Sequence, residues 1–170
     1  IKKGTVKTYK TNENGKEFNT GYYTNKQYFG YSSFVKKIPH FENSKAITET
    51  QLYKISKDEI TSILNNNHHV LYNFIDLLTS NTIANTSQLT LLAYGSVRKK
   101  TAITLLNLLK NYPEVKNNEI FITRLNLANS IGIAKETLTR TLHDFKEEKL
   151  IDLSNKSLTI LNKELLLKIN

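Results

Sequence analysis

The chain has no cysteine among its 170 residues, so it can form no disulfide and cannot hold an iron–sulfur cluster through thiolates. No apolar run is long enough to span a bilayer, and the first residues lack the pattern of a signal peptide. A glycine-rich phosphate loop is missing, as is a credible set of nucleophile, base and orienting residue. We therefore expect neither enzymatic activity nor membrane insertion.

Metal and cofactor sites are also not indicated. His68 and His69 are adjacent, whereas two metal ligands on one helix are usually three or four residues apart. Adjacent side chains point away from each other on a helix, so we read both as ordinary polar residues near a helix start. We expect no metal ion and no cofactor.

Positive charge is abundant. Lysine and arginine number 24 against 15 acidic residues, which gives a net charge of +9 and a pI near 9.6. Such a balance favours a polyanionic partner, because binding releases counterions. An AT-rich genome also enriches lysine, asparagine and isoleucine, so the charge is supporting evidence only. The length suits one domain or two small ones.

The segment from Thr123 to Leu142 has the residue pattern of a helix-turn-helix. Gly132 falls where the chain must turn sharply, and a missing Cβ makes a positive φ inexpensive there. Thr123 can cap the first helix with its hydroxyl. An ordinary helical hairpin is the alternative. The positions expected to pack the two helices together are Leu127, Ala128, Ile131, Ile133 and Leu138.

The second helix of this segment offers polar side chains at its start. Glu136 and Arg140 are four residues apart and so project side by side. A carboxylate can accept from cytosine N4, and a guanidinium can donate twice to guanine. The alternative is a solvated ion pair. Position at the start of the second helix favours base reading.

A small β-hairpin, or wing, is expected after the second helix. Leu150 to Leu153 forms its first strand, residues 154–156 the turn and Ser157 to Leu161 its second strand. Lys156 at the tip can reach a DNA phosphate, although a lone lysine in a turn is more often solvated. A helix from Val97 to Tyr112, ended by Pro113, precedes the motif. Its packing positions are Ala102, Leu105, Leu106 and Leu109.

A long helix from about His68 to Ala93 carries a seven-residue apolar repeat, which makes a two-stranded coiled coil plausible. The alternative is that this stripe packs on the β-structure of its own subunit. Polar residues in the middle of the stripe can fix register or contact a ligand. The predicted dimer interface is Leu71, Ile75, Leu78, Thr82, Asn85, Leu89 and Leu92.

Three short motifs resemble the winged helix of the Crp/Fnr family, the regulators related to the cyclic-AMP receptor protein and FNR. They are ITR at 122–124, KETLTR at 135–140 and KLI at 149–151. Upstream, IKKGTVKTYKTNENGKEF at 1–18 resembles the later strands of the family's β-roll, with a hairpin turn at Glu13–Lys16, and YFGYSSF at 28–34 resembles the lining of its nucleotide pocket. The resemblance covers nearly the whole chain.

The resemblance implies an α+β fold with three parts. These are a partial cyclic-nucleotide-binding-like β-roll (1–66), a dimerisation helix (67–95) and a C-terminal winged helix-turn-helix (96–170). The family's roll has strands before the first one recognised here, so we expect that the given sequence is a fragment. A two-fold dimer presents two recognition helices about 34 Å apart, which predicts an inverted-repeat operator. Gly95 and Ser96 are small enough to act as a hinge, and a plain interdomain joint is the alternative.

The resemblance also assigns roles in DNA binding. Glu136 and Arg140 are expected to read bases with help from Lys135, which stands where the best-known member has arginine. Ala134 replaces the serine that usually caps this helix and touches phosphate, so one cap is expected to be missing. The residues expected to contact phosphates are Thr123, Arg124, Thr137, Thr139 and Lys156.

The family's cyclic-nucleotide signature is incomplete. It combines a Gly-Glu pair for the ribose with an Arg-Ser pair for the phosphate, whereas here Tyr31 follows Gly30 and residues 39–44 read PHFENS. A phosphate buried without a guanidinium is costly, so we expect no tight cyclic-AMP binding, with His40 and Lys45 as the alternative cations. The candidate effector positions are Gly30, Tyr31, Asn85 and Thr86. A different ligand could be lined by aromatic residues, although such residues more often form the core or surface of a roll; they are Tyr22, Tyr23, Tyr28, Tyr31 and Phe34.

The sequence therefore predicts a dimeric, sequence-specific DNA-binding regulator of the bacterial cytoplasm, with double-stranded DNA as its partner, RNA polymerase as a further candidate partner and an effector that the sequence does not identify. One alternative is a ligand-sensing or protein-binding scaffold whose winged helix makes protein contacts. Another keeps DNA binding but places control in a domain before Ile1.

Overall fold

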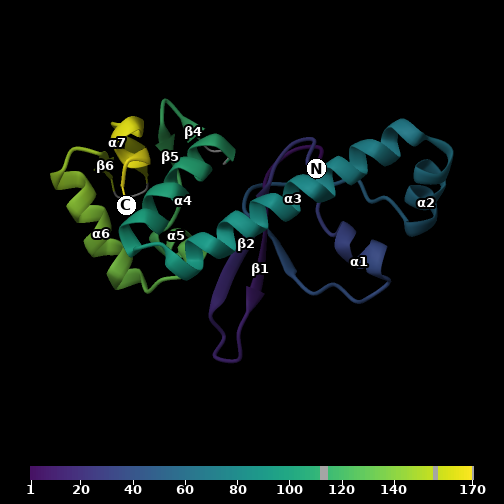
Figure 1. Cartoon of the computed structure of the whole chain (residues 1–170), viewed down its shortest axis with the longest axis horizontal. Helices are drawn as coiled ribbons and strands as arrows, with labels where there is room; N and C mark the ends of the chain where they lie inside the picture. Colours follow the sequence, from purple (N-terminus) through teal and green to yellow (C-terminus); the bar gives the residue numbers. More distant parts are fainter. Residues whose placement is uncertain (112–114, 155–156, 170) are drawn as a thin grey trace. The chain divides into compact units, whose positions relative to one another are not determined.

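The computed structural model describes residues 1–111, 115–154 and 157–169. Two compact units emerge, one built from Ile1–Gln51 together with Gly95–Asn170 and the other from Leu52–Tyr94 (Figure 1). The first and last parts of the chain thus pack into a single unit. The expected domain boundaries at residues 66 and 95 remain a prediction. Among the described residues, no helix combines the length and hydropathy needed to cross a membrane.

A three-stranded antiparallel sheet with the order β2-β1-β3 forms the N-terminal part of the first unit. Strands β1 (Val6–Thr11) and β2 (Glu17–Tyr23) make a hairpin, and β3 (Asn43–Ala46) pairs with the other edge of β1. The side chain of Asn12 accepts hydrogen bonds from two backbone N–H groups of the turn. The predicted hairpin turn at Glu13–Lys16 is therefore confirmed. Helix α1 is Tyr31–Lys36.

One extra residue in β2 changes which side chains share a face of this hairpin. Thr8 pairs with Gly21 and Tyr9 pairs with Asn19, so Thr20 is an unpaired bulge. Strand side chains normally alternate between faces, and one inserted residue reverses the alternation beyond it. Asn19 and Tyr22 consequently lie on the same face.

The second unit consists of helices α2 (Lys57–Asn66) and α3 (His68–Tyr94). A capping box starts α2: the Ser56 hydroxyl accepts from the Glu59 N–H, while the Glu59 carboxylate accepts from the Ser56 N–H and thereby lowers the pKa of Glu59. Helix α3 begins at the predicted His68 and runs one residue beyond the predicted end. None of its side chains is buried.

The C-terminal part of the first unit holds four helices around one hydrophobic core. They are α4 (Val97–Asn111), α5 (Arg124–Ile131), α6 (Lys135–Glu147) and α7 (Lys163–Leu167). All four predicted α4 packing positions lie in this core or against it, and Tyr112 and Pro113 lie outside the described residues. The largest fully buried side chains of the core are Phe145, Leu105, Ile120, Leu127, Ile131, Leu138, Leu142, Ile151, Leu158, Ile160 and Leu166.

Two interactions of Arg98 hold α4 against the end of α6. Nη2 of Arg98 donates to both carboxylate oxygens of Glu148 at 2.7 Å each. The Arg98 guanidinium also lies 4.9 Å from the centre of the buried Phe145 ring, which is a cation–π distance. The last turn of α6 is thereby held against α4.

A four-stranded sheet with the order β4-β5-β7-β6 covers this core. Its wing strands β6 (Ile151–Leu153) and β7 (Leu158–Ile160) are each shorter than predicted, and the tip at Asn155–Lys156 lies outside the described residues. The sequence analysis missed β4 (Val115–Lys116) and β5 (Glu119–Ile120). Both residues of the turn that joins them, Asn117 and Asn118, have positive φ, as a type I′ hairpin turn requires.

Candidate nucleic-acid interface

Helix α5 starts and ends as the sequence predicts for the first helix of a helix-turn-helix. The Thr123 hydroxyl accepts a 3.1 Å hydrogen bond from the Asn126 N–H, which is an N-cap. At the other end Gly132 has φ 76°, and the N–H groups of Gly132 and Ile133 both donate to the Ala128 carbonyl. The two bonds to Ala128 fix the turn into the next helix, while the Thr123 bond fixes the start of α5.

Small size at position 128 lets α5 and α6 approach closely. Ala128 and Leu138 are almost fully buried, and both belong to the cluster formed by the two helices and the sheet. Burial of one leucine side chain contributes about 1.5 to 3 kcal/mol to folding. The two helices therefore form one packed body with the wing, as a helix-turn-helix requires.

Helix α6 is amphipathic, with one buried and one exposed face. Leu138, Thr141, Leu142 and Phe145 are buried, while the side chains at the opposite positions are exposed. Ala134 occupies the N-cap position with extended backbone and makes no side-chain cap, so the expected loss of that cap is confirmed. The exposed polar side chains are Lys135, Glu136, Thr137, Thr139 and Arg140.

The two side chains predicted to read bases are not paired with each other. No ion pair within 4.0 Å joins Glu136 to Arg140, although both residues are described, so the alternative of a helix ion pair is not realised. Thr139 differs, because its hydroxyl donates to the Lys135 carbonyl of its own helix at 2.9 Å. Glu136 and Arg140 thus remain available for an external partner.

Arg124 joins the start of α5 to the wing. Its Nη2 donates to the Ser154 carbonyl at 3.2 Å, while Nη1 is buried with no hydrogen-bond partner among the described residues. Partial burial lowers the pKa of Arg124. The guanidinium lines a crevice of about 330 Å³ together with Thr139, Leu142, His143, Lys146, Leu153 and Ser154.

This crevice adds two cationic or titratable residues that the sequence analysis did not single out. His143 and Lys146 both come from the exposed side of α6. Lys146 lies 3.1 Å from Asp152 of the wing, and that hydrogen bond lowers the pKa of Asp152. The spacing of three from Arg140 to His143 and again to Lys146 was a usable signal, since residues three apart lie on one helix face.

The predicted effector positions lie in both units, and the predicted dimer stripe lies in the second. Gly30 and Tyr31 lie at the start of α1 in the first unit, whereas Asn85 and Thr86 are exposed on α3 in the second. Along the predicted dimer stripe, Ile75 and Leu89 are 47% and 66% exposed. The stripe has two polar residues, Thr82 and Asn85. The Thr82 hydroxyl donates to the Leu78 carbonyl of its own helix, whereas the Asn85 side chain makes no bond of this kind among the described residues.

Tyr22 was expected either to line a ligand pocket or to belong to a core or surface, and it lies in a core contact. It packs against the core of the C-terminal helices, and its hydroxyl lies 3.1 Å from the Ser130 hydroxyl of α5. The bulge at Thr20 turns it to this side. Tyr22 therefore belongs to the contact between the β1–β2 hairpin and α5.

Comparison with known proteins agrees with this arrangement. The family model of the cyclic nucleotide-binding domain matches residues 1–67, and that of the Crp-like helix-turn-helix domain matches residues 99–169. The chain is 23% identical over 164 residues to the regulatory protein HlyX of Actinobacillus pleuropneumoniae, covering 94% of this chain and 68% of that protein. It is 27% identical to the cAMP-activated global transcriptional regulator CRP of Haemophilus influenzae, covering 93% and 72%.

The fold has a close counterpart among solved structures. FixK2 from Bradyrhizobium japonicum superposes with a TM-score of 0.87 at 16% identity, covering all of this chain and 85% of FixK2. The two domain matches, the relatives and the α+β fold define one class of protein. The chain belongs to the Crp/Fnr family of transcription regulators and carries the family's helix-turn-helix DNA-binding domain. Its relatives are regulators, not enzymes.

Proposed function

We propose that this chain binds an inverted-repeat DNA operator as a homodimer and reads base edges with the amino end of α6. The observation that carries the proposal is the exposed and unpaired state of Glu136 and Arg140 on a helix whose other face is fully packed. A rigid helix with free donors and acceptors at its start suits the major groove. Lys135 adds a third polar side chain on this end.

Phosphate contacts are assigned to hydroxyl and cationic side chains near the same helix. The residues proposed to hold the DNA backbone are Thr123 and Arg124 at the start of α5, Thr137 and Thr139 on α6, and Lys156, which lies outside the described residues. Arg124 has part of its guanidinium committed to Ser154, so we assign it to placing the wing as well as to a phosphate. The net charge of +9 supports long-range attraction to DNA.

Dimerisation is proposed through α3. Its stripe leaves large apolar side chains in water, and exposed leucine and isoleucine at a seven-residue repeat are buried when two such helices pair. Two copies would then present two recognition helices one DNA turn apart.

Selection of bound duplexes from a random pool tests the proposed function. We expect an enriched inverted repeat with half-sites separated by about one helical turn, and retention that weakens with rising salt. Enrichment of single half-sites would contradict the dimer, and no enrichment over the starting pool would contradict sequence-specific binding.

A further inference from the structure

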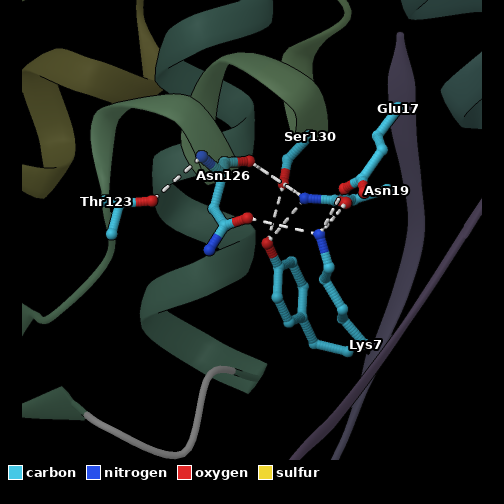
Figure 2. A network of polar contacts seen from close by, with 7 residues as sticks. Lys7, Glu17, Asn19, Thr123, Asn126 and Ser130 are labelled. Atoms are coloured by element: carbon cyan, nitrogen blue, oxygen red, sulfur yellow. Dashed lines mark hydrogen bonds and ion pairs between the residues drawn. The ribbon is translucent and has the colours of Figure 1, made fainter. Parts of the chain in front are cut away.

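A buried lysine joins the β1–β2 hairpin to α5, the first helix of the helix-turn-helix (Figure 2). The Lys7 side chain is only 5% exposed, and its Nζ lies 2.7 Å from Glu17 Oε2, 3.2 Å from Asn19 Oδ1 and 3.3 Å from Asn126 Oδ1. An ammonium has three N–H donors, so these three acceptors satisfy it completely. Two acceptors come from β2 and the third comes from α5.

Asn19 makes the second half of this contact. Because Lys7 can only donate, it fixes the Asn19 amide with Oδ1 toward the lysine and Nδ2 toward α5. Nδ2 lies 3.0 Å from the Asn126 carbonyl and 3.2 Å from the Ser130 hydroxyl, which itself donates to that carbonyl. Each bond has a defined direction, so together they fix the rotation of α5 against the hairpin.

The contact tolerates little intermediate movement. A partial separation would leave the Lys7 charge and the Asn19 amide buried without partners, which costs more than the intact bonds contribute. Polar interfaces between parts of a chain are also easier to separate fully than large apolar ones. The hairpin and α5 should therefore be either docked in this geometry or apart.

We propose that Lys7, Asn19 and Ser130 are positioning residues that hold the helix-turn-helix in one orientation, and that this orientation sets the half-site spacing that the protein accepts. The inference rests on the proposed binding of an inverted repeat by a dimer. It follows because α5 and α6 share one core, so an anchor on α5 also orients α6. None of the three residues is among those assigned to DNA.

Replacing Asn19 by alanine removes the group that bridges the two sides, and Ser130→Ala is a second variant with a residue that favours helices. Asn129→Ala is the matched control, because Asn129 is the same residue type as Asn126 on the same helix but takes no part in the contact. The probes are the selected inverted repeat, the same half-sites with the spacer changed by one or two base pairs, and one isolated half-site.

We expect Asn19→Ala and Ser130→Ala to bind the selected repeat about fivefold to tenfold more weakly, as expected for one or two lost hydrogen bonds. Binding to altered spacers should fall much less, and the half-site affinity and the control variant should match the wild type. An equal loss on all duplexes, or unchanged spacing preference, would overturn the proposal.

A measurement without DNA separates this inference from the proposed function. The chain has no cysteine, so Lys16→Cys and Glu147→Cys allow two spin labels on exposed sites of the hairpin and α6. We expect a narrow distance distribution in the wild-type background and in Asn129→Ala, and a broad one in Asn19→Ala. A narrow distribution in Asn19→Ala would refute positioning by this contact, whatever DNA the protein binds. If no duplex binds, the proposed function fails and the labels alone decide whether Asn19 orients α5.

Discussion

The phenol oxygen of Tyr22 in β2 lies 3.1 Å from the hydroxyl of Ser130 in α5, residues that are 108 positions apart in the chain. The same phenol oxygen accepts from Asn19 Nδ2 at 2.9 Å. Desolvation raises the pKa of Tyr22 above its ordinary value, and the hydrogen bonds from Ser130 and Asn19 offset only part of this rise. A neutral phenol is thus built into the contact between hairpin and helix.

Stability should therefore fall in alkaline solution partly through Tyr22. A folded-state pKa above the unfolded value of about 10 means that the contribution is complete below that pH and is lost as pH rises through the folded pKa. Urea unfolding between pH 8 and 11 should show a steeper loss for the wild type than for Tyr22→Phe. Parallel curves for the two proteins would assign the alkaline loss to other groups.

Arg140→Ala should weaken binding to the selected operator by about 1 to 3 kcal/mol and relax the preference at one base pair of each half-site. Arg140→Lys keeps the charge but removes the two-pronged donor, so it should relax the same preference with a smaller loss of affinity. Competition binding against single-base variants of the operator measures both. Equal losses on every sequence would show that Arg140 contacts the backbone only.

Ala134→Ser should stabilise the protein by about 0.5 to 1 kcal/mol, because the extended backbone at the N-cap of α6 already suits a capping hydroxyl. Ala134→Thr should act in the same direction, and Ala134→Val, which has the shape of threonine without its oxygen, is the control. Thermal or urea unfolding gives the difference. A gain shared by Val and Thr would point to packing instead of capping.

Leu89→Glu should convert the proposed dimer to monomers, since it places a charge at an exposed stripe position of α3. Ser80→Glu adds the same charge to α3 outside the stripe and should leave the oligomeric state unchanged. Sedimentation over a range of protein concentrations distinguishes the two. Dimers that survive in Leu89→Glu would place the interface elsewhere.

Cyclic AMP should bind weakly or not at all, because residues 39–44 supply no arginine for its phosphate. Isothermal titration at millimolar nucleotide measures this directly. His40→Ala and Lys45→Ala test the two cations that could replace the arginine. Submicromolar affinity that either substitution abolishes would contradict the prediction and identify the replacement.

The helix-turn-helix was predictable because its determinants are local. Thr123 caps, Gly132 turns and Ala128 permits the crossing, each through its own backbone position and nearest neighbours. Strands β4 and β5 were missed because each has only two residues, and because β5, the partner of β4, depends on pairing with β7, almost forty positions later. The paired asparagines at 117–118 were a local signal for their turn.

The contact of Lys7 and Asn19 with α5 could not be derived from strand alternation. Simple alternation puts Asn19 and Tyr22 on opposite faces, and only the bulge, set by pairing with β1, brings them together. Their partners on α5 are more than a hundred residues away in sequence. A lysine in a strand is also usually exposed, so its burial depends on acceptors that tertiary structure supplies.

The unpaired Thr20 has a consequence for how this protein can change over time. Deleting the codon for Thr20 would remove the bulge and leave a regular strand in which Asn19 and Tyr22, then two positions apart, still share a face, so Tyr22 would keep its place beside Ser130. Loss of this one amino acid is thus a change in strand length that descendants of this regulator could accumulate while the hairpin keeps the same face toward α5.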